Sequence, residues 1–74
     1  MKHRTIALTA INISDKFKQR IPATGKIARA YRFYKMNGKF DRDIILDKNN
    51  TLTDGYTAYL IAKMFSVEKV EVAA

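Results

Sequence analysis

The chain has 74 residues, of which 47% are hydrophobic, and a formal net charge of +7 at pH 7. This length fits one modest core, so we expect a single domain over residues 1–74. The chain contains no cysteine, which excludes disulfides, thiolate metal sites and a thiol nucleophile and is typical of a cytoplasmic protein. No stretch approaches the roughly 20 apolar residues of a membrane span, so we expect no membrane association.

The N-terminal segment predicts a strand over residues 5–11, because apolar and polar residues alternate there. Ile6, Leu8 and Ala10 would form its buried face. A signal peptide is a poorer interpretation, because the apolar run is short and threonines interrupt it. Residues 12–23 are typical of a loop, although a helical turn within it remains open. The four-residue spacing of its large apolar residues indicates that they anchor the loop on the core; these are Ile13, Phe17 and Ile21.

A helix is predicted over residues 26–36, with Thr24 as its N-cap. Gly38 is placed to end it in the left-handed conformation. The predicted apolar stripe has the spacing i, i+3, i+4, i+7 and consists of Ile27, Ala30, Tyr31 and Tyr34. Phe33 lies among basic residues and is a candidate for stacking on a nucleobase; packing beneath a neighbouring loop is the alternative.

Basic residues are concentrated in residues 16–42, which hold nine Lys or Arg and only one acid, Asp41. Such asymmetry indicates a polyanionic partner, of which nucleic acid is the commonest, whereas a merely solvated face is the alternative. The residues expected to contact nucleic acid are Lys26, Arg29, Arg32, Lys35, Lys39 and Arg42.

The C-terminal half predicts a strand over 44–46, a turn at 48–50 and a returning strand over 51–53. Asp54-Gly55 interrupts that strand, and a helix begins at Tyr56 with an apolar stripe of Ala58, Ile61, Ala62 and Phe65. Val67, Val70 and Val72 indicate a last strand, after which Ala73 and Ala74 should fray. The order β-α-β-β-α-β predicts an α/β (α+β) fold, with two main helices on a small mixed sheet of about four strands.

The passage from strand to helix at Gly55 presents free backbone N–H groups and the positive end of a helix dipole. We therefore expect Gly55, Tyr56 and Thr57 to bind an anion, the alternative being a plain connection without a ligand.

No metal site is expected. The segment from Asp47 begins like a calcium loop, but Leu52 stands where that loop needs glycine and Ala58 where it needs glutamate, so turn formation explains the segment better. Asp41 and Asp43 flank Arg42 and should form a surface ion pair with it.

The strand, turn and helix around Leu52-Thr53-Asp54-Gly55-Tyr56-Thr57-Ala58-Tyr59, followed by Val67-Glu68-Lys69-Val70-Glu71-Val72, resemble the ParB/sulfiredoxin-like domain. The resemblance implies that fold, with an anion-binding helix. Sulfiredoxins carry Gly-Cys-His-Arg at this turn, and nucleotide-hydrolysing partition proteins carry Gly-Glu-Arg-Arg. Of these motifs only Gly55 is present, so we expect a short stand-alone member that is not an enzyme and has no cofactor. The partition proteins place a DNA reader in a downstream domain, before which this chain ends.

Two functions follow as hypotheses. The first is a non-enzymatic, partition-protein-like accessory module of a phage or plasmid, which binds nucleic acid through phosphate contacts from residues 16–42. The second is a small phage or mobile-element interaction module or inhibitor that docks its basic face on an acidic host protein such as a nuclease. The small size also leaves a homodimer open.

Overall fold

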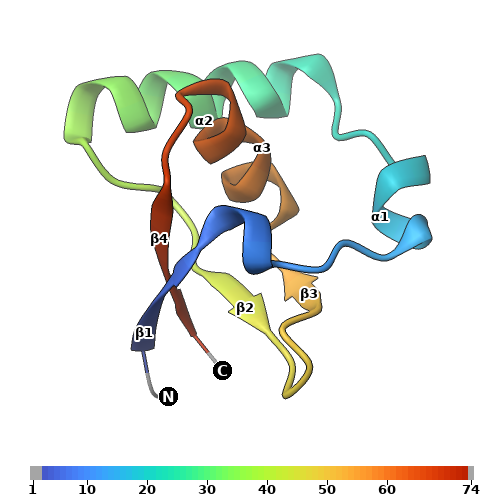
Figure 1. Ribbon diagram of the computed structural model, residues 1–74. Helices are drawn as coiled ribbons and strands as arrows, with labels where there is room; N and C mark the ends of the chain where they lie inside the picture. The colour runs from blue at the N-terminus through green and yellow to red at the C-terminus, as the bar shows by residue number, and fades with distance from the viewer. Residues whose placement is uncertain (1–2, 74) are drawn as a thin grey trace.

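The computed structural model describes residues 3–73, which form a four-stranded mixed sheet with helices stacked against it (Figure 1). The strands are β1 (His3–Ala7), β2 (Ile44–Leu46), β3 (Leu52–Asp54) and β4 (Lys69–Ala73). Their order in the sheet is β1-β4-β2-β3; β4 runs antiparallel to β1 and parallel to β2, and β3 runs antiparallel to β2. The predicted α/β fold with a small mixed sheet is thus confirmed, and the last strand of the chain lies inside the sheet.

That central position explains the burial of β4. Val70 and Val72 point into the core, while Lys69 and Glu71 are exposed, as the alternation predicted. The prediction that Ala73 frays is wrong: Ala73 is fully buried and pairs with His3 on one side and Ile45 on the other. Ala74 lies outside the described residues.

The first strand is shorter than predicted. It ends at Ala7, and residues Leu8–Ala10 form a 3-10 helix, η1. Leu8 and Ile11 are buried, whereas Ala10 is exposed, so the predicted burial of Ala10 is wrong. The physical reason is the three-residue repeat of the 3-10 helix, which brings residues three apart to the same side.

The helices are α1 (Asp15–Gln19), α2 (Thr24–Asn37) and α3 (Tyr56–Met64), one more than predicted, because a short helix forms within the expected loop. Ile13 and Phe17 pack against the core as predicted, but Ile21 is 76% exposed, so its predicted anchoring role is wrong. After η1 the chain runs beside β3, where Asn12 makes a parallel bridge to Thr51.

Helix α2 starts earlier than predicted. Ala23 occupies the N-cap position, and Thr24 is the first helical residue and makes no capping hydrogen bond. Gly38 ends the helix with φ 69°, as predicted. Of the predicted stripe Ala30 is buried, but Tyr31 remains 39% exposed.

Helix α3 lies between the sheet and α2 (Figure 1). Ala58, Ile61 and Ala62 are buried as predicted, whereas Phe65, at the end of the helix, is 36% exposed and stacks on Tyr31. No helix among residues 3–73 is long and apolar enough to cross a membrane.

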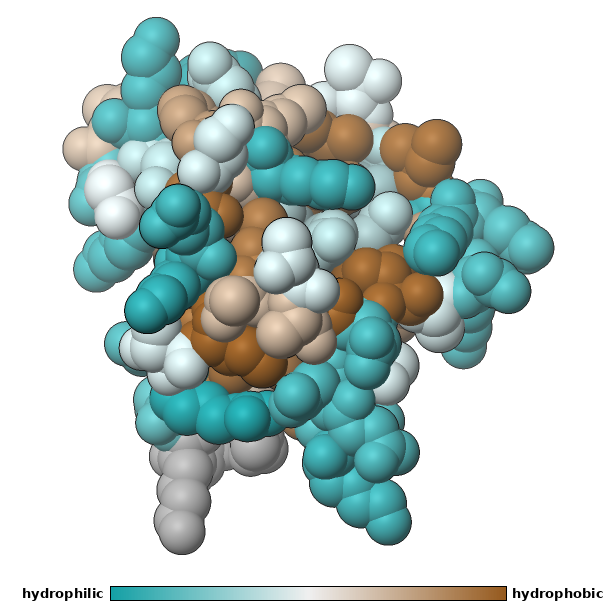
Figure 2. Space-filling view, viewed as in Figure 1, coloured by the Kyte–Doolittle hydropathy of each residue, from teal (hydrophilic) through white to brown (hydrophobic). Residues whose placement is uncertain are grey.

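The β2–β3 connection is a tight turn, as predicted. An Asp47 carboxylate oxygen accepts hydrogen bonds from the N–H groups of Asn49 and Thr51 at 2.8 and 3.0 Å. Asn50 adopts φ 61°, the left-handed conformation that asparagine tolerates. Polar side chains cover this turn and the α1 side of the face seen in Figure 2, and apolar surface lies between them.

Candidate functional site

Gly55 fixes the start of α3 against the segment that precedes β2. Its φ of 87° lies in the left-handed region, and a Cβ atom there would stand 2.4 Å from the Asp43 carbonyl oxygen and 2.9 Å from Ile44 Cα. Both neighbours are backbone atoms, which cannot swing away. Only glycine fits this position, and the start of α3 is therefore held against the main chain of the sheet.

The first turn of α3 has unused hydrogen-bond donors. The Gly55 N–H donates to Asp54 Oδ1 at 2.9 Å, and the first intrahelical bond runs from the Tyr59 N–H to the Gly55 oxygen at 3.0 Å. Within residues 3–73, no acceptor bonds the N–H groups of Tyr56, Thr57 and Ala58. These groups and the helix dipole give this end of α3 a positive partial charge.

A hollow of about 460 Å³ opens in front of this turn, and we call it the α3 pocket. Its walls come from α1, the α1–α2 linker, the first turns of α2 and the segment before β2. The charged residues that line it are Arg20, Lys26, Arg29, Asp41, Arg42 and Asp54. Four cations against two carboxylates leave this lining with a net positive charge.

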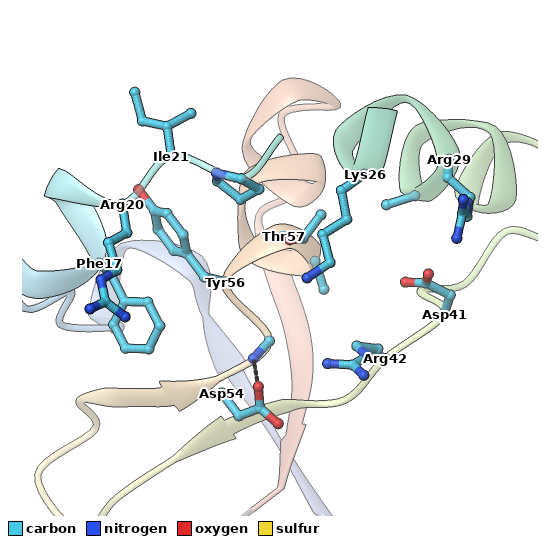
Figure 3. A pocket seen from close by; sticks show the side chains of 14 residues that line it. Phe17, Arg20, Ile21, Lys26, Arg29, Asp41, Arg42, Asp54, Tyr56 and Thr57 are labelled. Atoms are coloured by element: carbon cyan, nitrogen blue, oxygen red, sulfur yellow. Dashed lines mark hydrogen bonds between the residues drawn. The ribbon is translucent and has the colours of Figure 1, made fainter. Parts of the chain in front are cut away.

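The cations differ in how they approach α3 (Figure 3). Lys26 and Arg42 point into the space before the first helical turn, whereas Arg29 points toward Asp41 and Arg20 lies on the α1 side. The expected ion pair of Asp41 and Asp43 with Arg42 is not formed. Across residues 3–73 the close contact between a basic and an acidic side chain joins His3 Nδ1 to Glu71 Oε1 at 3.3 Å. The Arg42 guanidinium is therefore not committed to a carboxylate.

Aromatic rings support the pocket at its α1 end. Phe17 and Tyr56 lie with ring centroids 5.4 Å apart, and Tyr56 stacks on Tyr59 at 6.0 Å. Because Phe17 also packs on the core, its contact with Tyr56 holds α1, and Arg20 after it, close to the start of α3.

The structure divides the predicted nucleic-acid residues into groups. Lys26, Arg29 and Arg42 line the α3 pocket together with the predicted anion-binding residues 55–57. Lys39 lines a neighbouring hollow, which it shares with Arg42, while Arg32 and Lys35 line neither of the two. Phe33 is half-buried and lines neither hollow, so its exposed, base-stacking position is not supported.

Sequence reasoning missed Arg20 as a site residue, although it counted Arg20 within the basic segment. The signal was available: Phe17 was expected to contact the core, and Arg20 follows it within one helical turn. The residues that follow Gly55 include no arginine, yet cations from other segments occupy the surroundings of Gly55.

The neighbouring hollow also measures about 460 Å³ and lies between the end of α2, the segment before β2, and β4. We call it the aromatic hollow, because Tyr34 and Phe40 line it. Its charged lining residues are Lys39, Arg42, Asp43, Lys69 and Glu71. Within residues 3–73 no group of three or more His, Cys, Asp or Glu side chains is placed to hold a metal ion.

No model of a known protein family matches the chain, and no curated protein matches it. Solved structures do. One crystal form of the Pnob8-like ParB-N domain superposes with a TM-score of 0.80 and 21% sequence identity, over 96% of this chain and 28% of the other. A second structure of the pNOB8-like ParB N-domain gives a TM-score of 0.77 at 21% identity, over 96% of this chain and 26% of the other.

These similarities confirm that the chain has the fold of ParB N-domains, as the resemblance at Gly55 predicted. The chain spans little more than a quarter of the length of those proteins.

Proposed function

We propose that the chain is a non-enzymatic module that binds nucleic acid through its phosphates, with the α3 pocket as the principal contact. One observation carries this proposal. Cations from three separate segments, the α1–α2 linker, α2 and the segment before β2, surround the free N–H groups at the start of α3. A phosphate is the ligand that uses both the donors and the charge.

The mechanism would be charge neutralisation. The N–H groups of Tyr56 and Thr57 would donate to one phosphate oxygen, while Lys26 and Arg42 contact the others from the open side. Arginine suits phosphate because its planar guanidinium donates two parallel hydrogen bonds. Such contacts release counterions and carry no base identity, so binding should depend on salt and only weakly on sequence.

The absence of turnover and of a cofactor belongs to the same proposal. Residues 55–58 keep only the glycine of the motifs with which relatives of this fold do chemistry, and the chain has no cysteine. His3, the only histidine, lies on β1 and contacts Glu71 rather than the α3 pocket. The likeness to ParB N-domains supports a partition-protein-like accessory role, which we place in the cytoplasm of a cell that carries a phage or plasmid.

The test is a fluorescence anisotropy titration of DNA and RNA oligonucleotides of unrelated sequence at several salt concentrations. We expect similar affinities across sequences and a linear fall of log affinity with log salt. Each phosphate contact should contribute a slope of roughly 0.7 to 0.9. An affinity that does not change with salt, or no binding to any of the oligonucleotides, would contradict the proposal.

A second candidate, docking on an acidic protein, is favoured by a different surface. Outside the α3 pocket, helices α2 and α3 carry three Lys or Arg residues, and neither helix contains Asp or Glu; the three are Arg32, Lys35 and Lys63. Tyr31, Met64 and Phe65 are also 39%, 59% and 36% exposed. If the oligonucleotides do not bind, this candidate predicts that a defined acidic host protein co-purifies at low salt and is lost in the double variant Arg32→Ala/Lys35→Ala.

A further inference from the structure

The aromatic hollow adjoins the α3 pocket, and Arg42 lines both. Its volume of about 460 Å³ is of the size found for sites that enclose small ligands, which run from roughly 300 to 1,000 Å³. A ligand that fills the α3 pocket and continues past Arg42 therefore enters this second hollow.

Stacked rings form one wall of the aromatic hollow. Phe40 stacks on Tyr34 with ring centroids 4.8 Å apart and an angle of 25° between the planes. Tyr34 continues to Phe65 at 4.8 Å, and Phe65 to Tyr31 at 5.0 Å. Phe40 is thus the terminal ring of a row of four contacting rings; it packs partly against the core and also lines the hollow, where its accessible part can meet a flat ring.

The charges of the aromatic hollow suit a nucleobase better than a second phosphate. Lys39, Arg42 and Lys69 are opposed by Asp43 and Glu71, so the lining is nearly balanced. Carboxylates repel a phosphate but accept hydrogen bonds from the amino groups of bases. The α3 pocket has more positive charge and free N–H donors, and its rings, Phe17 and Tyr56, lie at its α1 end.

We propose that the ligand is single-stranded nucleic acid, with a phosphate in the α3 pocket and an unstacked base against Phe40 in the aromatic hollow. Arg42 would hold the backbone between the two. This inference rests on the proposed function, because it takes the phosphate site as given. A duplex cannot fill the aromatic hollow, since its bases are paired and stacked, whereas a single strand exposes the faces of its bases.

The test compares a fluorescein-labelled oligothymidine of about 12 nucleotides with a duplex of the same length at one salt concentration. We expect the single strand to bind at least about fivefold more tightly, the lower end of what one base–aromatic stack contributes. Phe40→Leu should remove this advantage and leave duplex binding unchanged. Tyr31→Leu is the matched control: it removes a ring from the same row but outside both hollows, and should change neither affinity.

A melting curve shows whether Phe40→Leu folds, and a crosslink on the unaltered chain keeps the test independent of that variant. Oligonucleotides carrying 5-iodouracil should crosslink on irradiation to Tyr34 or Phe40, as identified by mass spectrometry. Equal, salt-dependent binding of both strand forms, with crosslinks elsewhere, would overturn the single-strand inference and leave the phosphate site standing. No binding of either form would overturn the proposed function and this inference together.

Discussion

The starts of α2 and α3 make an informative comparison, because neither helix has a side-chain cap. At α2 the first turn is exposed, and a Cβ atom on Gly25 would meet nothing within 4 Å. At α3 the preceding Gly55 is buried and pressed against the backbone of residues 43–44. Both helix ends offer free N–H groups, yet only at α3 is the preceding glycine packed against backbone, and only there do the residues with free N–H groups line the α3 pocket.

Under the proposed function, the surroundings of a helix N-terminus decide whether it binds an anion. Charge from α2 itself reaches the α3 pocket, since Lys26 and Arg29 line it. The same helix carries Arg32 and Lys35 outside that pocket. A run of basic residues that is uniform along the sequence is therefore divided by the fold, and the predictions below test that division.

The largest expected effect is that of Gly55→Ala. The new Cβ would collide with the Asp43 carbonyl while the backbone remains in a left-handed conformation, so we expect a loss of about 3 kcal/mol in the free energy of unfolding. Urea denaturation measures it.

Gly25→Ala is the matched control at the other helix start. Alanine has the higher helix propensity and the site is open, so the free energy of unfolding should rise by about 0.5 to 1 kcal/mol. Equal effects of the two substitutions would show that the start of α3 is no more tightly packed than that of α2.

The next prediction compares the two halves of α2, which carry two basic residues each. Lys26→Ala/Arg29→Ala should weaken oligonucleotide binding by roughly tenfold, because both substitutions remove positive charge from the α3 pocket, and should reduce the salt slope by about 0.7 to 0.9, because the Lys26 contact to phosphate is lost. Arg32→Ala/Lys35→Ala makes the same change in net charge outside the α3 pocket and should reduce affinity much less. Anisotropy titrations provide the measurement, and identical losses in both double variants would indicate a diffuse basic surface in place of a pocket.

The smallest effect concerns Asp54, whose carboxylate opposes an anion in the α3 pocket. Asp54→Asn removes the charge but retains the Oδ1 atom that accepts the Gly55 N–H. We expect affinity for the oligonucleotide to rise about two- to threefold at low salt, and the gain to vanish at high salt, as for exposed charges generally. Weaker binding by this variant would mean that the carboxylate contacts the ligand favourably.

Local patterns predicted the elements near the α3 pocket well. Residues 44–46, the end of the strand before Gly55 and the helix from Tyr56 appear as expected, because alternation, turn residues and helical spacing agree there. The returning strand is displaced by one residue, since β3 spans Leu52–Asp54 and not the predicted 51–53. Residues 8–23 were predicted less well. Leu8 and Ile11 suit either a strand or a 3-10 helix, and only contact with the core decides between them. A five-residue helix such as α1 has too little periodicity to be recognised.

The candidate site was predictable in parts but not as an arrangement. The sequence marked Gly55 as an anion site and residues 16–42 as basic, yet nothing in it linked the two. Placing Lys26 and Arg42 before Gly55 depends on how α2 crosses α3 and on how the chain returns to β2, which is a tertiary property. For the same reason the sequence alone could not show that Arg29 lines the α3 pocket while Arg32 and Lys35 do not.

The most direct test of the account is a ¹H–¹⁵N correlation titration of the labelled chain with a short oligonucleotide, comparing the amides at the two helix starts. The account predicts that the amide signals of Tyr56, Thr57 and Ala58 shift most as their free N–H groups take up a phosphate. The signals of Thr24 and Gly25 should move less, because these residues do not line the α3 pocket, although Lys26 beside them does. Larger shifts at Thr24 and Gly25, or equal shifts at both helix starts, would contradict the claim that the α3 pocket binds the anion.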